Sequence, residues 1–211
     1  MPRVLSDSDV TDFRDRACAV AARLFAAKGV EGVTMRELAS ALGVSAMTPY
    51  RYFRDKDDIL AAVRARAFER FAEKLETAYA GPGTVVERAH AKGDAYVRFA
   101  LEEPATYRLM FDLSQPTEEQ YPDLVRAMTR ARATMTSHVR DLVAEGIISG
   151  DPELIGHVFW AMLHGAVTLQ LAGKLSAQYK QSPQYGIDQI LAEAGRALGE
   201  GFRAGVPKRR E

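Results

Sequence analysis

The feature that most limits the fold of this chain is the spacing of its apolar residues, which recur every three or four positions in one segment after another. Such spacing places apolar side chains on one face of a helix. The first such face, within residues 9–28, is made of Phe13, Ala17, Val20, Ala21, Leu24 and Phe25. No segment alternates polar and apolar residues as a half-buried strand does. The sequence therefore predicts an all-α fold of about nine helices.

Glycine and proline separate these helical segments. Gly29 and Gly43 end two N-terminal segments, and Gly81-Pro82-Gly83 makes the clearest break. Asp151-Pro152 and Ser182-Pro183 each start a helix, because Asp or Ser caps the first N–H groups and proline fits the first turn. The expected helices cover residues 9–28, 34–42, 45–53, 55–80, 84–103, 107–111, 123–145, 152–173 and 183–202.

Charge and cysteine content exclude several classes of protein. Lys and Arg together number 28, as do Asp and Glu, so the formal net charge is zero. A chain without excess positive charge does not coat nucleic acid or an anionic membrane nonspecifically, so any DNA contact must come from a local patch. Cys18 is the single cysteine, which excludes an intrachain disulfide and cysteine-rich metal sites. These features favour a protein of the reducing cytoplasm.

One segment reaches the length of a membrane span. Residues 154–173 carry no formal charge. They include two histidines and three glycines, and they lack the flanking basic and aromatic belts of a spanning helix. We therefore expect a helix buried in protein, with no membrane contact. Gly165 and Gly173 leave room on it for another helix to approach, with dimer packing as the preferred reason.

Residues 34–53 carry the sharpest local signal. Thr34 and Glu37 form a capping box that starts a short helix, and the turn Gly43-Val44-Ser45 separates it from a second one. Ala39 lies four residues before Gly43, and a small side chain is needed where the two helices of a helix-turn-helix cross. This spacing favours a DNA-binding helix-turn-helix over a plain helix hairpin.

The second helix of this motif would present the side chains that read DNA. Residues early in such a helix meet base edges in the major groove. Met47 and Thr48 suit a thymine methyl group or a hydrogen bond to a base, and Arg51 suits guanine or a phosphate. The remaining candidates are phosphate donors that fix the register, namely Ser45, Tyr50, Tyr52 and Lys56.

These motifs resemble the TetR family of transcriptional regulators, the tetracycline-repressor-like proteins. The resemblance is strongest over residues 13–63 and rests on Ala22–Phe25, Gly29, Val33–Ala39, Leu42–Ser45, Tyr50–Phe53 and Lys56 with Leu60. The rest of the chain is similar to a TetR subgroup whose C-terminal domain carries a Trp-His-Gly signature. Trp160, His164 and Gly165 match that signature, and residues 104–111 also resemble the subgroup.

The resemblance implies a homodimeric, cytoplasmic transcriptional repressor. Two recognition helices would enter successive major grooves of a pseudo-palindromic operator in double-stranded DNA, ~34–36 Å apart. The last two helices would form the dimer interface. A small-molecule effector in the C-terminal domain would shift the helix 56–79 and release the DNA. The expected domains are a helix-turn-helix domain (1–55), a connecting helix (56–80) and a ligand-binding and dimerisation domain (81–211).

Family DNA contacts carry over to Thr34, Arg36, Thr48, Tyr50, Arg51, Tyr52 and Lys56. The chain departs from the family pattern at Met47, where glycine is frequent, and at Pro49, where leucine or another apolar residue is usual. Proline lacks an N–H and belongs in the first turn of a helix. Two arrangements follow. Either Ser45 caps the helix and Pro49 leaves one hydrogen bond unmade, or Thr48 is the cap and Pro49 is the first helical residue.

Candidate effector-binding residues lie in two C-terminal segments. Trp160 and His164 share a helix face, and their ring nitrogens need partners when buried. Tyr107, Met110 and Phe111 lie beside a proline break, and methionine with aromatic residues suits an apolar pocket. Both sets also fit ordinary core packing at helical spacing. As a binding site they favour a largely apolar effector, and no cofactor is expected.

An enzymatic function has little support in the sequence. Glu153, His157 and His164 share a helix face in a metal-like spacing, but no second helix supplies a Glu-x-x-His partner. The chain also lacks Gly-x-Ser-x-Gly, phosphate-loop and dinucleotide-binding motifs. We therefore expect neither an enzyme nor a metal site. The alternative is an all-α small-molecule-binding or enzymatic bundle in which the helix hairpin is only structural.

Overall fold

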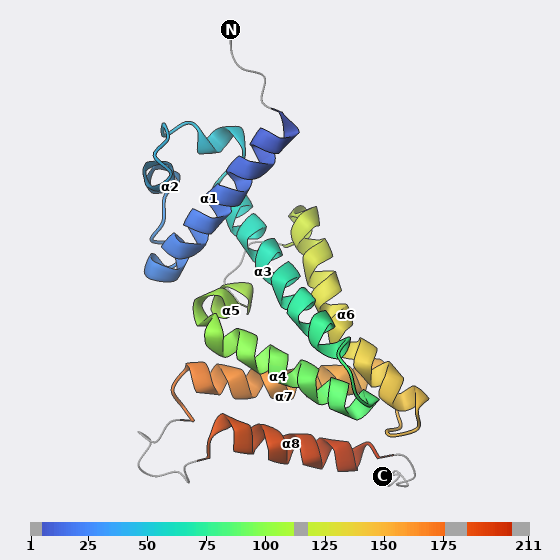
Figure 1. Ribbon diagram of the computed structural model, residues 1–211. Helices are drawn as coiled ribbons and strands as arrows, with labels where there is room; N and C mark the ends of the chain where they lie inside the picture. Colours follow the sequence, from blue (N-terminus) through green and yellow to red (C-terminus); the bar gives the residue numbers. More distant parts are fainter. Residues whose placement is uncertain (1–5, 112–117, 176–184, 204–211) are drawn as a thin grey trace. The chain divides into compact units, whose positions relative to one another are not determined.

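The computed structural model describes residues 6–111, 118–175 and 185–203 (Figure 1). Within these ranges it contains eight α-helices, two short 3-10 helices and no strand, so the all-α prediction is confirmed. The elements are α1 (Asp7–Lys28), α2 (Met35–Ala41), η1 (Pro49–Arg51), α3 (Lys56–Tyr79), α4 (Val85–Glu102), α5 (Pro104–Phe111), η2 (Glu118–Gln120), α6 (Pro122–Ala144), α7 (Pro152–Leu171) and α8 (Ile187–Gly201). The expected start of the last helix at Ser182-Pro183 lies outside the described residues.

The expected count of nine helices is wrong by one, because residues 45–53 do not form an α-helix. This segment makes a turn and then the 3-10 helix η1. Pro49 has no N–H to donate to the carbonyl of Ser45, so α-helical hydrogen bonding does not begin before it. The N–H of Phe53 donates to the carbonyl oxygen of Pro49 at 3.0 Å, which closes a single helical turn.

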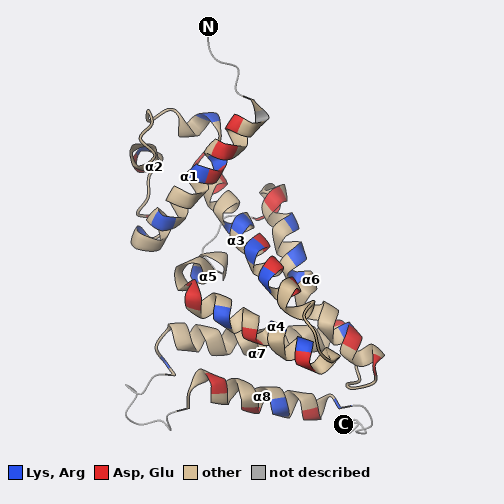
Figure 2. Cartoon of the chain, viewed as in Figure 1, with Lys and Arg blue, Asp and Glu red and all other residues tan. Residues whose placement is uncertain are grey.

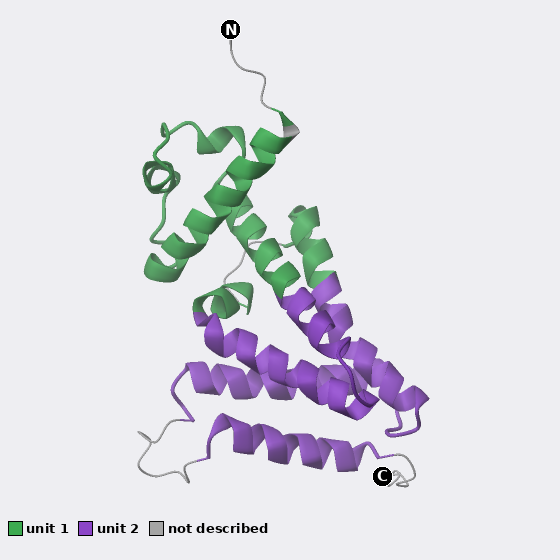
Figure 3. Cartoon of the chain, in the orientation of Figure 1, with its two compact units in different colours: residues 1–70, 105–129 green, residues 71–104, 130–211 purple. Residues whose placement is uncertain are grey.

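The chain divides into two compact units (Figure 3). Unit 1 contains residues 1–70 and 105–129, and unit 2 contains residues 71–104 and 130–211. Both α3 and α6 contribute residues to each unit. The third boundary follows Pro104, the first residue of α5, so all three unit boundaries fall inside helices rather than in loops.

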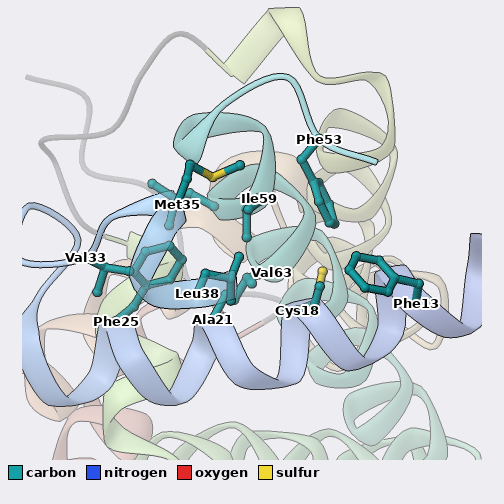
Figure 4. Close-up of a cluster of buried hydrophobic side chains, with 12 residues drawn as sticks. Phe13, Cys18, Ala21, Phe25, Val33, Met35, Leu38, Phe53, Ile59 and Val63 are labelled. Atoms are coloured by element: carbon teal, nitrogen blue, oxygen red, sulfur yellow. The ribbon is translucent and has the colours of Figure 1, made fainter. Parts of the chain in front are cut away.

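Unit 1 has a core built around one face of α1 (Figure 4). Its buried members are Phe13, Ala17, Cys18, Ala21, Phe25, Val33, Met35, Leu38, Phe53, Ile59, Leu60 and Val63. Phe13, Ala17, Ala21 and Phe25 follow one another at four-residue spacing, as the sequence pattern predicts. Burying a large apolar side chain stabilises the fold by ~1.5–3 kcal/mol, so this face fixes α1 against its neighbours. Cys18 belongs to the core, and burial raises the pKa of its thiol.

The first helix of the predicted helix-turn-helix, α2, is defined at both ends by local hydrogen bonds. Thr34 caps its start, since the Thr34 hydroxyl accepts from the Glu37 N–H at 3.2 Å. At its end, the Val44 N–H donates to the Ala39 carbonyl at 3.0 Å and the Gly43 N–H to the Ser40 carbonyl at 3.1 Å. This pair of bonds needs a left-handed residue, and Gly43 has a φ of 68°.

In unit 2, α7 packs against α4 and α8. A separate apolar cluster contains Val85, Val139, Leu142, Ile148 and Ile155. The close approach between α7 and α6 is at Gly156, where a Cβ atom would lie 2.8 Å from Thr136 Cγ2. At Gly165 a Cβ atom would meet no described atom within 4 Å, so none of the described helices uses the space that this glycine leaves.

The helix α7 is uncharged after its first turn (Figure 2). By length and composition it is apolar enough to cross a membrane, with a mean hydropathy of 1.3. Only 22% of its apolar window is buried within the chain. The chain alone therefore supplies little of the burial that the sequence led us to expect for this helix.

Candidate functional site

The helix-turn-helix segment of unit 1 exposes most of the predicted DNA-binding side chains. Arg36 lies in the first turn of α2 and is exposed, as are Thr34 and Ser45. Met47 is 69% exposed and Tyr50 is 48% exposed, although both are large and partly apolar. These two exposed side chains make the segment a candidate contact surface. We call residues 45–53 the reading turn.

The reading turn agrees with the second of the two arrangements expected at Pro49 in one respect only: Pro49 begins the helical turn, but the Thr48 side chain does not cap it. Pro49 is the first residue of η1 and Thr48 is in the capping position. The Thr48 hydroxyl makes no capping bond to the backbone; it lies 2.8 Å from the hydroxyl of Ser45, and either group can donate. The pair brings two hydroxyls together on an exposed turn, next to Met47. Arg51 ends η1 and is exposed.

Two predicted phosphate donors have partners within unit 1. Tyr52 is half-buried and stacks on Phe13, with 4.0 Å between the ring centroids and 22° between the ring planes. The Lys56 ammonium donates to the carbonyl oxygen of Val30 at 3.0 Å and to Glu31 at 3.2 Å. These contacts anchor the reading turn and the start of α3 to the rest of the unit.

Two arginines that the sequence analysis missed link the reading turn, α1 and α3 within unit 1. Arg14 of α1 donates to the backbone carbonyl of Tyr52, and its guanidinium carbon lies 4.3 Å from the ring centroid of Phe53. Arg66 of α3 donates to the backbone carbonyls of Arg14 and Asp15, each at 3.2 Å. Nothing in the local sequence distinguishes these residues from ordinary surface arginines, because their partners are about 40 to 50 positions away.

Unit 2 contains a cavity of about 1060 Å³. Its walls come from α3, α4, α6, α7 and α8 and include Leu75, Val97, Met135, Leu142, Phe159 and Trp160. A concave, mainly apolar space with a few polar groups is the usual form of a small-molecule site. Two ionisable side chains with perturbed pKa values, Lys92 and His138, also line it.

Lys92 of α4 is 3% exposed, and its ammonium points toward α6. It donates to the carbonyl oxygen of Thr134 and to the hydroxyl of Ser137 at 3.1 Å, and it lies 3.4 Å from His138 Nδ1. Burial lowers the pKa of Lys92 to about 8. Burial, followed by the nearby charge of Lys92, lowers the pKa of His138 to about 4, so His138 is neutral at pH 7.

The predicted effector-binding residues are divided between the two units. Trp160 lines the cavity, and the Nδ1 atom of His164 lies 3.5 Å from the hydroxyl of Tyr96, another lining residue. Burial lowers the pKa of His164. Tyr107, Met110 and Phe111 belong to unit 1. In that unit Phe111 packs edge-on against Phe68 at 5.6 Å between centroids, and Tyr107 and Met110 are buried. The sequence analysis missed Lys92, Tyr96 and His138.

The metal-like residues of α7 make other contacts. His157 Nδ1 lies 2.6 Å from the carbonyl oxygen of Glu153, and its Nε2 lies 3.3 Å from a guanidinium nitrogen of Arg132. The Glu153 carboxylate pairs with Arg140. Among the described residues, no group of three or more His, Cys, Asp or Glu side chains is arranged to hold a metal ion.

Comparison with known proteins identifies the family. Residues 18–63 match the model described as bacterial regulatory proteins, tetR family, and residues 89–194 match the tetracyclin repressor-like C-terminal domain. The chain belongs to the TetR family. As a TetR-family protein it is a DNA-binding, helix-turn-helix transcriptional regulator, a class that is not enzymatic. TetR-family regulators are soluble cytoplasmic proteins, and homodimers and small-molecule ligands are typical of them.

Individual relatives agree with this assignment. The HTH-type transcriptional activator FasR of Mycolicibacterium smegmatis is 27% identical over 182 residues, which cover 86% of this chain and 78% of FasR. An HTH-type transcriptional regulator of Staphylococcus aureus is 36% identical over 68 residues, covering 32% of this TetR-family chain and 37% of its own length.

Solved structures share the fold. A Rhodococcus protein of unknown function superposes with a TM-score of 0.76 at 27% identity, covering 96% of this chain and 99% of its own. The TetR-family regulator PfmR of Thermus thermophilus superposes with a TM-score of 0.63 at 22% identity, covering 87% and 97% of the two chains.

Proposed function

We propose that this TetR-family protein is a dimeric repressor that binds a pseudo-palindromic operator and leaves it when a small molecule enters the unit 2 cavity. The observation that supports this most directly is the pairing of an exposed reading turn in unit 1 with a large apolar cavity in unit 2. In this proposal residues 1–55 bind DNA, 56–80 connect, and 81–211 bind the effector and dimerise.

The exposed residues of the helix-turn-helix are the proposed DNA contacts. Met47, with the paired hydroxyls of Ser45 and Thr48, would meet base edges or the nearest phosphate. Arg36 and Arg51, with the hydroxyl groups of Thr34 and Tyr50, would bind the phosphate backbone or guanine. Tyr52 and Lys56 would contribute less to DNA affinity, because Tyr52 stacks on Phe13 and Lys56 donates to the carbonyl of Val30. Their remaining hydrogen-bond donors would bind phosphate.

A second copy of the chain is the proposed partner of α7 and α8. The apolar window of α7 is only 22% buried, and Leu169 on this helix is 48% exposed. Gly165 leaves open space on the same helix. A long apolar helix with this little burial in a water-soluble regulator is explained if another subunit covers it.

The effector site is the unit 2 cavity. Trp160 lines it, and His164 is linked to it through Tyr96. With Gly165, these two residues make up the proposed Trp-His-Gly signature of the subgroup. We assign Tyr107, Met110 and Phe111 to packing within unit 1, because their described neighbours lie there.

The proposal is tested by titrating the purified protein onto DNA flanking its own gene at several salt concentrations. We expect saturable binding to one palindromic stretch at two subunits per site. The variant Arg51→Ala should lower affinity and reduce the slope of log affinity against log salt by ~0.9 for each phosphate that it no longer neutralises. The matched control is Arg126→Ala, which removes an exposed arginine of α6. Wild-type affinity in Arg51→Ala would overturn the assignment of Arg51.

The direction of regulation is read from the same operator. FasR is named an activator. Expression of a reporter gene placed downstream of the operator should fall when the protein is present. It should recover when a ligand that releases the protein from DNA is added. If reporter expression instead rises when the protein is present, the protein is an activator, and the DNA-binding assignment still holds.

A further inference from the structure

The charged side chains around the unit 2 cavity are unequally buried. Asp94, Arg98, Asp188, Arg196, Glu200 and Arg203 line it but are exposed. Lys92 is the exception among these described charged residues, with 3% of its surface exposed. The charged side chains that line the cavity are therefore solvated, except for the buried ammonium of Lys92.

Among the described residues, the Lys92 ammonium has only neutral partners at contact distance. They are the carbonyl of Thr134, the hydroxyl of Ser137 and the imidazole of His138, and the ring of Tyr79 lies 5.0 Å from its nitrogen. Within the described part of the chain, no carboxylate forms an ion pair with it. Buried cations in proteins are normally paired, because leaving water is costly for an unpaired charge.

The two carboxylates whose charges act on Lys92 each have a hydrogen-bond partner of their own. Glu76 of α3 forms a two-point contact with Arg130 of α6. Asp141 of α6 accepts a hydrogen bond from the Tyr79 hydroxyl at 2.5 Å. Both act on Lys92 at longer range and favour its charged form, but burial outweighs them. Arg88 of α4 adds a further positive charge beside Tyr79, 5.3 Å from the ring centroid.

We propose that the effector is an organic acid with an apolar body, and that Lys92 receives its carboxylate while the body occupies the cavity. This inference rests on the proposed function of the cavity and names its ligand class. The longest of the three Lys92 contacts is the one to His138, at 3.4 Å. The N–H of Lys92 that makes this weak contact would donate to the ligand carboxylate instead. The body would lie against Leu75, Val97, Met135, Leu142 and Trp160.

Other ligand classes fit the same cavity less well. A cationic ligand would meet the charge of Lys92 at short range. A neutral apolar ligand would fill the cavity but leave the buried ammonium without a counter-charge. An anionic group instead supplies the missing counter-charge, and a charge-assisted hydrogen bond of this kind is shorter and stronger than a neutral one.

The test is a titration with decanoate, decanamide and decylammonium, followed by calorimetry and by the fluorescence of Trp160, the one tryptophan in the sequence. In the wild-type protein, decanoate should bind about 10- to 100-fold more tightly than decanamide, the range expected for one hydrogen bond to a charged group. Decylammonium should bind more weakly than either. In Lys92→Met the advantage of decanoate should disappear, and in Lys92→Arg it should return in part.

A second readout follows the proton on Lys92. With a pKa of about 8, Lys92 is about half protonated at pH 8, so binding an anion should draw in about 0.5 proton per decanoate. Calorimetry in two buffers of different ionisation enthalpy measures this uptake. It should be absent in Lys92→Met and unchanged in Lys74→Met, which removes an exposed lysine of α3. The uptake in the wild-type protein tests the proposal even if Lys92→Met fails to fold.

Each outcome decides the inference separately from the proposed function. Equal binding of decanoate and decanamide, or no binding of decanoate, overturns the organic-acid assignment. Binding that depends on Lys92 with proton uptake supports it. Operator affinity is then measured with decanoate present. An unchanged operator affinity would contradict effector control by this cavity while leaving the anion site established.

Discussion

Arg14 of α1 donates a hydrogen bond to the backbone carbonyl of Tyr52, near the end of the reading turn. The same guanidinium lies over the ring of Phe53, 4.3 Å from its centroid. Because η1 is only three residues long, it has few hydrogen bonds of its own to hold its shape. A side chain from another helix therefore fixes the backbone that presents Met47 and Tyr50.

Replacing Arg14 by Met should loosen the reading turn without removing a DNA contact. We expect operator affinity to fall several-fold and the free energy of unfolding to fall by ~1.5–3 kcal/mol, the range for a hydrogen bond to a charged group. The salt slope of binding should stay near the wild-type value, unlike that of Arg51→Ala. Arg23→Met, an exposed arginine on the same helix, is the control. Wild-type operator affinity in Arg14→Met would show that the turn keeps its shape unaided.

The same substitution at two glycines should change stability in opposite directions. Gly43 has a φ of 68°, so Gly43→Ala places a Cβ in the left-handed region and should cost ~1–2 kcal/mol. Gly93 lies inside α4, and a Cβ there meets no described atom within 4 Å. Gly93→Ala should therefore raise the free energy of unfolding by ~0.5–1 kcal/mol. Urea unfolding at one protein concentration measures both; a shared sign would contradict the backbone argument.

Placing a charge on the open face of α7 should separate the subunits. Leu169 is 48% exposed in the single chain, and Leu169→Glu would bury a carboxylate in the proposed interface. We expect monomers in sedimentation velocity and a loss of operator affinity of ten-fold or more, because two linked heads bind far more tightly than one. Leu101→Glu changes a leucine of α4 that is 39% exposed and should leave the dimer intact. If the Leu169→Glu protein is still dimeric, Leu169 does not lie in the dimer interface.

Acid should destabilise unit 2 through His138. Burial, and then the charge of Lys92, lowers the pKa of His138 to about 4 from the ordinary value of 6.5. The unfolded chain therefore binds a proton more tightly than the folded one. The stabilisation is complete above pH 6.5 and is lost as the pH falls toward 4, by on the order of 2–3 kcal/mol.

The variant His138→Asn removes this titration and keeps an oxygen that can accept from Lys92. Urea unfolding at pH 7 and pH 4.5 should show a smaller loss of stability in this variant than in the wild type. His90→Asn changes an exposed histidine of the same unit and should follow the wild type. An equal pH dependence in all three proteins would show that His138 is not the group responsible.

Several elements were predictable from neighbouring residues. The four-residue spacing from Phe13 to Phe25 predicts the buried face of α1, and Thr34 and Gly43 predict the two ends of α2. These features depend on helical periodicity and on hydrogen bonds between residues a few positions apart. The reading turn shows the limit of that reasoning. Its position was predicted, but Pro49 at the start of η1 leaves a single turn where a helix was expected.

Residues whose environment depends on distant segments were not predictable in this way. Lys92 looks like a solvated charge in the sequence, yet it is buried by a contact to Thr134, 42 positions along the chain. Among the glycines of α7, the sequence drew attention to Gly165, whereas the close approach to α6 is at Gly156. Tyr107 and Met110 were candidates for the effector site, but their burial is in unit 1.

The sequence by itself determined that this protein is all-α and where its helix-turn-helix lies, because periodicity, caps and turns are properties of contiguous residues. Only the tertiary structure decided which side chains are held by partners, where the cavity forms and which cation it buries. Those outcomes depend on helices far apart in the chain packing together, which removes water from some residues and not from others of the same type.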